Sequence, residues 1–95
     1  MTISTSKWDA ADYLDDEDAI RAYVEAAFED GDPAIIAHAL GDVARARGMT
    51  SIAREAGVTR EALYKALSET GDPRLSTLVG VIRALGLKLS IEAKP

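Results

Sequence analysis

The sequence predicts a small all-α domain that ends in a short β-strand. Two observations predict the helices: apolar residues recur at every third or fourth position, and glycines or an Asp-Pro pair separate these periodic segments. A third observation predicts the strand, because apolar and polar residues alternate over residues 87–92. A chain of 95 residues supports one modest core, so we expect residues 1–95 to form a single domain.

Residues 1–14 carry little periodic pattern, and we expect this segment to be only partly ordered. One short helical turn over residues 9–14 should direct Tyr13 and Leu14 inward. Trp8, the single tryptophan, has two interpretations: a residue that packs on the core, or an anchor that enters the pocket of a partner. The residues alone leave both open.

A helix is predicted over residues 15–30. Asp15 or Asp16 caps its first turn, because a side-chain oxygen there accepts an otherwise unpaired N–H, and Gly31 ends it. Residues at helical spacing form one apolar stripe: Ile20, Tyr23, Val24, Ala27 and Phe28.

The next helix begins at Asp32-Pro33, because its first turn does not need the N–H that proline lacks, and it ends at Gly48. Its apolar stripe consists of Ile36, Ala39, Leu40, Val43 and Ala44. Gly41 weakens this helix, so we assign it to close packing against another helix. His38 has no cysteine or second histidine to join it, and we interpret it as a surface or packing residue rather than a metal ligand or general base.

Residues 50–69 are predicted to form two short helices around one tight turn. Gly57 lies where the first helix must end in a left-handed residue, and Thr59 is a suitable cap for the second. One face of the second helix carries Ala62, Leu63, Ala66 and Leu67. Its opposite face is polar, as in a helix–turn–helix whose second helix enters the major groove of DNA. The alternative is an ordinary αα-corner, which uses the same small residues.

A final helix is predicted over residues 75–85, followed by Gly86, with an apolar stripe of Leu75, Leu78, Val79, Ile82 and Leu85. The alternating segment 87–92 comes next. A lone strand leaves its backbone groups unpaired, so this strand must pair with its copy in a second subunit or with an extended N-terminal segment.

Several phrases of the sequence resemble a known family. The stretch TSIAREAGVTREALYKALSE is similar to the lambda-repressor-like helix–turn–helix. The phrases GDVARARGM, REALYKAL and ALGLKL together resemble the HigA-like antitoxins, which are addiction-module antidote proteins of type II toxin–antitoxin systems. The similarity continues upstream through YLDDEDAIRAYVEAAFEDGDPAIIAHAL and covers nearly the whole chain. It implies a five-helix fold, repression of the protein's own operon and neutralisation of a RelE/ParE-like toxin.

The polar face of the second short helix supplies most of the candidate DNA contacts. An arginine can bridge O6 and N7 of guanine, and a glutamate can accept from N4 of cytosine. For each basic residue the alternative is a solvated surface charge. Because one copy covers about half of an operator, we predict a homodimer on an inverted repeat. The candidates are Thr50, Ser51, Arg54, Thr59, Arg60, Glu61, Tyr64, Lys65 and Arg74.

The formal charge of −5 is divided unevenly along the chain. Residues 1–44 contain eleven acidic and two basic residues, whereas residues 45–95 contain nine basic and five acidic ones. DNA phosphates attract the second half and repel the first, which suggests two different partners. The resemblance makes the acidic half the toxin-binding part, while helix capping and solubility are the plainer explanation. The candidate toxin contacts are Trp8, Asp12, Tyr13, Asp15, Asp16 and Asp18.

Several function classes are disfavoured by what the sequence lacks. It has no cysteine, one histidine, no glycine-rich phosphate loop and no metal-ligand spacing, so we expect no cofactor and no enzyme activity. No apolar run approaches the roughly 18 residues of a membrane span, and no secretory signal is evident, so we expect a soluble cytoplasmic protein. A stand-alone Cro-like repressor without a toxin is the alternative function, but it gives no reason for the acidic half.

Overall fold

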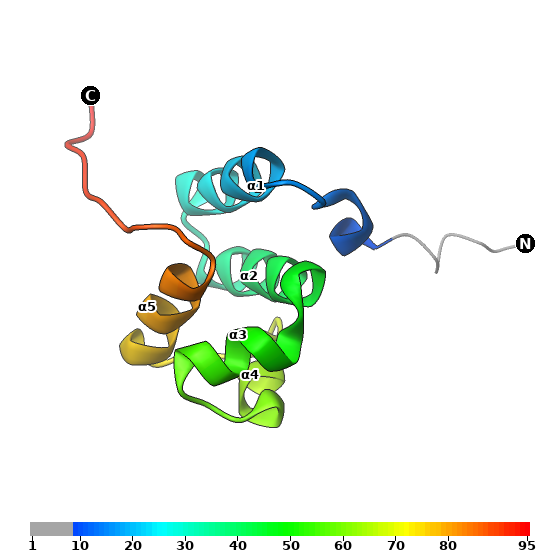
Figure 1. The fold of residues 1–95 in the computed structure, drawn as a ribbon. Helices are drawn as coiled ribbons and strands as arrows, with labels where there is room; N and C mark the ends of the chain where they lie inside the picture. Colours follow the sequence, from blue (N-terminus) through cyan, green and yellow to red (C-terminus); the bar gives the residue numbers. More distant parts are fainter. Residues whose placement is uncertain (1–8) are drawn as a thin grey trace, which may run out of the picture.

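The computed structural model describes residues 9–95, so the predicted roles of Trp8 lie outside the described residues. The predicted all-α class is confirmed, with five α-helices and one short 3₁₀ helix (Figure 1). These elements are η2 (Ala10–Tyr13), α1 (Glu17–Asp30), α2 (Pro33–Arg47), α3 (Met49–Ala56), α4 (Arg60–Ala66) and α5 (Leu75–Ala84). Within the described residues no helix is long and apolar enough to cross a membrane.

The caps of α1, α2 and α4 and the glycines after α1 and α3 lie where the local sequence predicts. Asp16 caps α1, Asp32 caps α2 and Thr59 caps α4, because each side chain accepts a hydrogen bond from a backbone N–H two or three residues later. Gly31 and Gly57 end α1 and α3 with φ of 85° and 78°. A residue with a Cβ is strained in this left-handed conformation, which glycine adopts at little cost.

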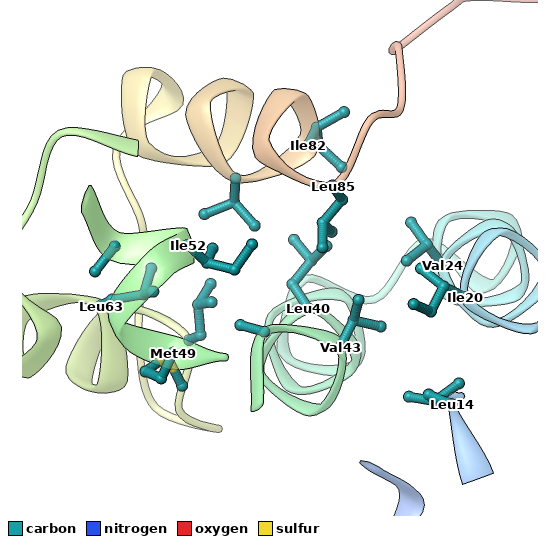
Figure 2. Packing of buried hydrophobic residues seen from close by; sticks show 14 residues of the cluster. Leu14, Ile20, Val24, Leu40, Val43, Met49, Ile52, Leu63, Ile82 and Leu85 are labelled. Atoms are coloured by element: carbon teal, nitrogen blue, oxygen red, sulfur yellow. The ribbon is translucent and has the colours of Figure 1, made fainter. Parts of the chain in front are cut away.

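The core is centred on α2, α3 and α5 (Figure 2). Leu40 and Val43 of α2, Leu63 of α4 and Val81 of α5 are almost completely buried there. α1 packs on α2, whereas α3 packs on α2, α4 and α5. As a result, α1 and the α3–α4 pair lie on opposite sides of α2 (Figure 1).

α4 is attached to the body by a narrow apolar stripe. The helix ends at Ala66, three residues before the predicted end, and Leu63 and Leu67 are its buried anchors. Ala62 was predicted to face inward but is exposed, because this short helix contacts its neighbours along one edge only. The close packing predicted for Gly41 is confirmed: a Cβ there would lie 2.9 Å from the carbonyl oxygen of Leu67.

Two apolar side chains that were predicted to face inward are exposed. Tyr13 is 64% exposed although Leu14 is buried. Tyr13 is the last residue of η2, and Leu14 follows it with a non-helical backbone of φ −103° and ψ 62°, so the two side chains point in different directions. Leu75 is 73% exposed because it is the first residue of α5 and precedes the part of the helix that reaches the core. Val81, which the predicted stripe omitted, is fully buried instead.

The strand predicted over residues 87–92 is not seen in the described part of the single chain. Within residues 9–95 there is no strand, and the backbone after Leu87 forms no hydrogen bond. Leu89 is 42% exposed and Ile91 is 99% exposed as the segment runs outward past α1 (Figure 1). Alternation determines which side chains share a face, but a strand also needs a neighbouring strand, and this helical body offers none.

Candidate nucleic-acid interface and acidic surface

The nine residues predicted to contact DNA are all exposed. They form one polar surface, called the α3–α4 surface below, because eight of them lie on or beside two helices that pack together. The ninth, Arg74, precedes α5 and joins this surface because it lines the same hollow of about 560 Å³ as Lys65. The surface consists of Thr50, Ser51, Arg54, Thr59, Arg60, Glu61, Tyr64, Lys65 and Arg74.

The outer face of α4 carries a stacked pair. The Arg60 guanidinium carbon lies 5.5 Å from the centre of the Tyr64 ring, and its Nη2 lies 3.5 Å from the Tyr64 hydroxyl. This cation–π contact orients the guanidinium along the helix without neutralising its charge. Leu63, between them in sequence, is buried on the opposite side and holds the pair outward.

The cations of the α3–α4 surface are not neutralised within the described chain. Arg54, Arg60, Lys65 and Arg74 form no ion pair among residues 9–95. α3 also begins without a side-chain cap, so the N–H groups of its first turn stay open beside Thr50 and Ser51. These groups are available to an anionic partner such as a phosphate.

A second group of predicted residues lies at the other end of the fold. Asp12, Tyr13, Asp15, Asp16 and Asp18 are exposed around η2 and the start of α1, and we call them the acidic surface. Two of them have structural roles, since Asp16 caps α1 and Asp18 lies 3.9 Å from Arg21. Asp12 and Asp15 form no ion pair among the described residues.

A shallow hollow of about 330 Å³ opens beside the acidic surface. It is lined by Ala10, Tyr13, Leu14 and Tyr23. The lining is aromatic and aliphatic, and acidic side chains lie close by in sequence on either side of Tyr13. This combination suits a partner with an apolar side chain set among basic ones.

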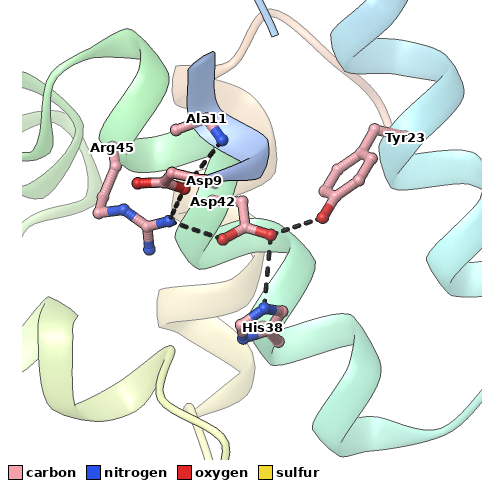
Figure 3. Close-up of polar contacts among 6 residues, drawn as sticks. All are labelled: Asp9, Ala11, Tyr23, His38, Asp42 and Arg45. Atoms are coloured by element: carbon pink, nitrogen blue, oxygen red, sulfur yellow. Dashed lines mark hydrogen bonds and ion pairs between the residues drawn. The ribbon is translucent and has the colours of Figure 1, made fainter. Parts of the chain in front are cut away.

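Asp42 is the residue that sequence reasoning missed. Helix capping and solubility were the plainer explanation for the acids of residues 1–44, but Asp42 is 2% exposed and lies inside a helix. It accepts hydrogen bonds from the Tyr23 hydroxyl at 2.5 Å and from Arg45 Nη2 at 2.8 Å, and His38 Nε2 lies 3.5 Å away (Figure 3). Arg45 also donates to Asp9 at 2.7 Å. The network therefore joins the segment before η2, α1 and α2.

The network shifts the pKa values of Tyr23, Asp9 and Arg45. Burial, together with the hydrogen bond to Asp42, raises the pKa of Tyr23 to about 12. The hydrogen bond from the Ala11 N–H and the Arg45 guanidinium lower the pKa of Asp9. Burial acts to lower the pKa of Arg45, but its hydrogen bonds to the two aspartates raise it.

The spacing of His38, Asp42 and Arg45, at i, i+4 and i+7 along one helix face, was the one available signal of this network. The interpretation of His38 as a helix-surface residue is confirmed, since half of its side chain is exposed.

Comparison with known proteins gives matches that span both surfaces. The family model described as "Probable addiction module antidote protein" matches residues 4–93. An uncharacterized protein of Haemophilus influenzae is 42% identical over 92 residues, which cover 97% of this chain and 95% of the relative. No solved structure matches the chain.

Proposed function

Because the chain belongs to the family of probable addiction module antidote proteins, we propose that it is the antitoxin of a type II toxin–antitoxin module. In this proposal the antitoxin is of the HigA-like kind and has two partners. The acidic surface neutralises a RelE/ParE-like toxin, and α3 and α4 bind operator DNA as a lambda-repressor-like helix–turn–helix. Family membership supports the antidote role, and the separation of charge supports two distinct surfaces.

One observation carries the DNA-binding part: four exposed cations of the α3–α4 surface have no acidic partner among the described residues. In the proposed complex α4 enters the major groove. Thr59, Arg60 and Glu61, at its start, lie nearest the base edges. One turn later, Tyr64 and Lys65 meet a phosphate or a thymine methyl group.

The flanking groups position α4 on the duplex. Thr50 and Ser51 offer hydroxyls at the uncapped start of α3, where open N–H groups hold a phosphate. Arg54 and Arg74 add charge on either side of α4. A homodimer places two such units on an inverted repeat, with the two groove-entering helices about 34 Å apart. Bound there, the dimer represses its own operon.

The acidic surface serves the second partner. Toxins that act on RNA need a basic surface, and an acidic protein covers such a surface with favourable electrostatics. Asp12 and Asp15 form neither an ion pair nor a capping hydrogen bond within the described chain, so both are open to a basic partner. The hollow beside Tyr13 receives an apolar side chain of the toxin. Trp8 belongs to the proposed toxin-binding set as well, although it lies outside the described residues.

The alternative is a stand-alone Cro-like repressor without a toxin. The cations that form no ion pair among the described residues support this alternative equally well, but it assigns no partner to the acidic surface. In either case we propose a cytoplasmic protein that is not an enzyme. The buried Asp42 already accepts from Tyr23 and Arg45, and the one histidine, His38, lies 3.5 Å from that same carboxylate.

Co-purification with the product of the adjacent gene tests the proposal, followed by binding of the complex to its upstream DNA over a salt series. We expect a stable complex, and DNA affinity that falls steeply as salt rises because released counterions drive the binding. A protein that binds the DNA but captures no neighbouring product is the stand-alone repressor. A protein that binds neither contradicts both functions.

A further inference from the structure

Residues 87–92 leave the helical body with open backbone groups and exposed apolar side chains. The start of the segment is fixed, because the Leu87 N–H donates to the Ile82 carbonyl at 3.0 Å and its side chain packs on the core. From residue 88 onward the backbone has no hydrogen bond within the described chain. Leu89 is 42% exposed and Ile91 is 99% exposed. The segment is therefore presented to solvent from a defined point.

Two copies of this segment are complementary when they run antiparallel about Ser90. In that register Lys88 of one copy lies opposite Glu92 of the other, so two opposite-charge pairs form. Leu89 lies opposite Ile91 on the other face, which brings four apolar side chains together. The segment thus matches itself in charge and in apolar character.

Neighbouring registers lose this match. Centring the pair on Ile91 places Lys88 opposite Lys94, two like charges. Centring it on Leu89 places Glu92 opposite Gly86 and leaves the charges without partners. If the two-fold axis passes between two residues, polar side chains of one copy lie opposite apolar side chains of the other on the same face of the ribbon.

We propose that residues 87–92 of two copies pair as an antiparallel β-ribbon centred on Ser90 and form the homodimer interface. This inference rests on the homodimer of the proposed function and names the residues that make it. The second copy supplies the neighbouring strand that a single chain lacks. A two-stranded ribbon alone is marginal. The helical body continues beside the segment, where a hollow of about 340 Å³ is lined by the apolar side chains of Val24, Phe28 and Ile82 together with Arg21 and Glu25.

Cross-linking tests the register, because the chain has no cysteine of its own. In S90C the two thiols face each other across the two-fold axis, within the Cα separation that a disulfide requires. In the controls K88C and E92C the two copies of the residue lie about 13 Å apart along the ribbon. We expect S90C to form a disulfide-linked dimer at least about tenfold faster than either control. Equal rates in all three variants, or no dimer in S90C, overturn the proposal.

A charge exchange tests the pairing without new chemistry. K88E and E92K each create two like-charge pairs per dimer, and we expect each to raise the dimer Kd roughly fivefold in sedimentation equilibrium. The double variant K88E/E92K restores opposite charges and should return the Kd to that of the native chain. Far-UV circular dichroism checks that all three fold, and both positions are exposed in the single chain.

The outcomes separate this inference from the proposed function. A dimer that is insensitive to all these variants places the interface elsewhere, which contradicts the inference and leaves the homodimer intact. A chain that is monomeric at all concentrations contradicts both the ribbon and the homodimer, even if it still binds a half-site. A chain that dimerises through residues 87–92 but binds neither DNA nor toxin supports the ribbon and contradicts the proposed function.

Discussion

The two halves of the described chain, residues 9–47 and 48–95, differ in how their positive side chains are paired. In residues 9–47 each arginine lies within 4 Å of a carboxylate, as Arg21, Arg45 and Arg47 do. In the second half the cations of the α3–α4 surface have no such partner among the described residues. Arginine is therefore paired within the chain in residues 9–47, whereas on the α3–α4 surface it is open to a binding partner.

α2 is the support that both regions share. Gly41 lets α2 approach the end of α4, and the next residue, Asp42, ties α2 to Tyr23 of α1 and, through Arg45, to Asp9. Two consecutive residues thus serve the two sides of one helix. Each of the following changes acts on one region and should spare the other.

The largest effect is expected for D42N, which removes the buried charge at the centre of the network. The asparagine amide keeps one carbonyl oxygen and presents an NH2 donor in place of the other, so either Arg45 or the Tyr23 hydroxyl loses its acceptor, and Arg45 also loses a charged partner. The free energy of unfolding should fall by about 2–3 kcal/mol, which is less than the full cost of breaking a deeply buried pair because Arg45 is partly exposed. Urea denaturation measures this. The control D12N, at an exposed acid, should stay within about 0.5 kcal/mol of the native protein. A D42N protein of unchanged stability would show that the network is dispensable.

R60A should weaken operator binding by about 1–3 kcal/mol, or roughly tenfold to a hundredfold, because an arginine on α4 reads bases or phosphates. R21A is the matched control, since Arg21 is an exposed helical arginine that is already paired with Asp18 and Glu25. Fluorescence anisotropy at fixed salt measures both. If R21A and R60A weaken binding equally, the effect is one of net charge and the comparison between the halves fails.

D12K/D15K should weaken toxin binding about tenfold while operator affinity is preserved or slightly improved. E29K/D30K changes the charge by the same amount at the far end of α1 and serves as the control. Surface plasmon resonance with the co-purified toxin measures the difference. If both double variants weaken toxin binding equally, the toxin does not bind at the acidic surface.

The smallest effect concerns pH. The pKa of Tyr23 is raised to about 12 in the folded protein and is 10.0 ordinarily, so between these values the unfolded chain loses the proton first. The contribution of Tyr23 to the free energy of unfolding is therefore complete below pH 10 and is lost as the pH rises through 12. At pH 11 the loss should be about 1 kcal/mol or less, because the ring is partly exposed. Urea midpoints at pH 9 and pH 11 should therefore differ more for the native protein than for Y23F. If the urea midpoint changes by the same amount between pH 9 and pH 11 in both proteins, the Tyr23 hydroxyl makes no pH-dependent contribution to stability.

The parts of the fold that depend on local chemistry could be predicted from the sequence. Asp16, Gly31, Gly57 and Thr59 begin or end helices through contacts within a few residues, and each does so in the structure. The polar outer face of α4 was predictable for the same reason, because helical spacing alone determines it. Its role as a DNA-binding face depends on a partner and stays a prediction.

The parts that depend on distant contacts could not be predicted. The burial of Asp42 arises because Tyr23 and Arg45 supply it with donors, one of them from another helix. The outward position of Tyr13 depends on where η2 ends, because Leu14 follows with a non-helical backbone. The alternation over residues 87–92 is typical of a strand, but residues 9–95 contain no other strand with which it could pair.

The separation of the two surfaces is tested most directly by titrating the isotope-labelled full chain with a duplex from upstream of its gene and following the amide chemical shifts. We predict that the changes concentrate at residues 50–65 and at Arg74, while Asp12, Asp15 and Asp18 keep their shifts. Changes that are strongest over residues 12–18, or an α4 that does not respond, would contradict the account.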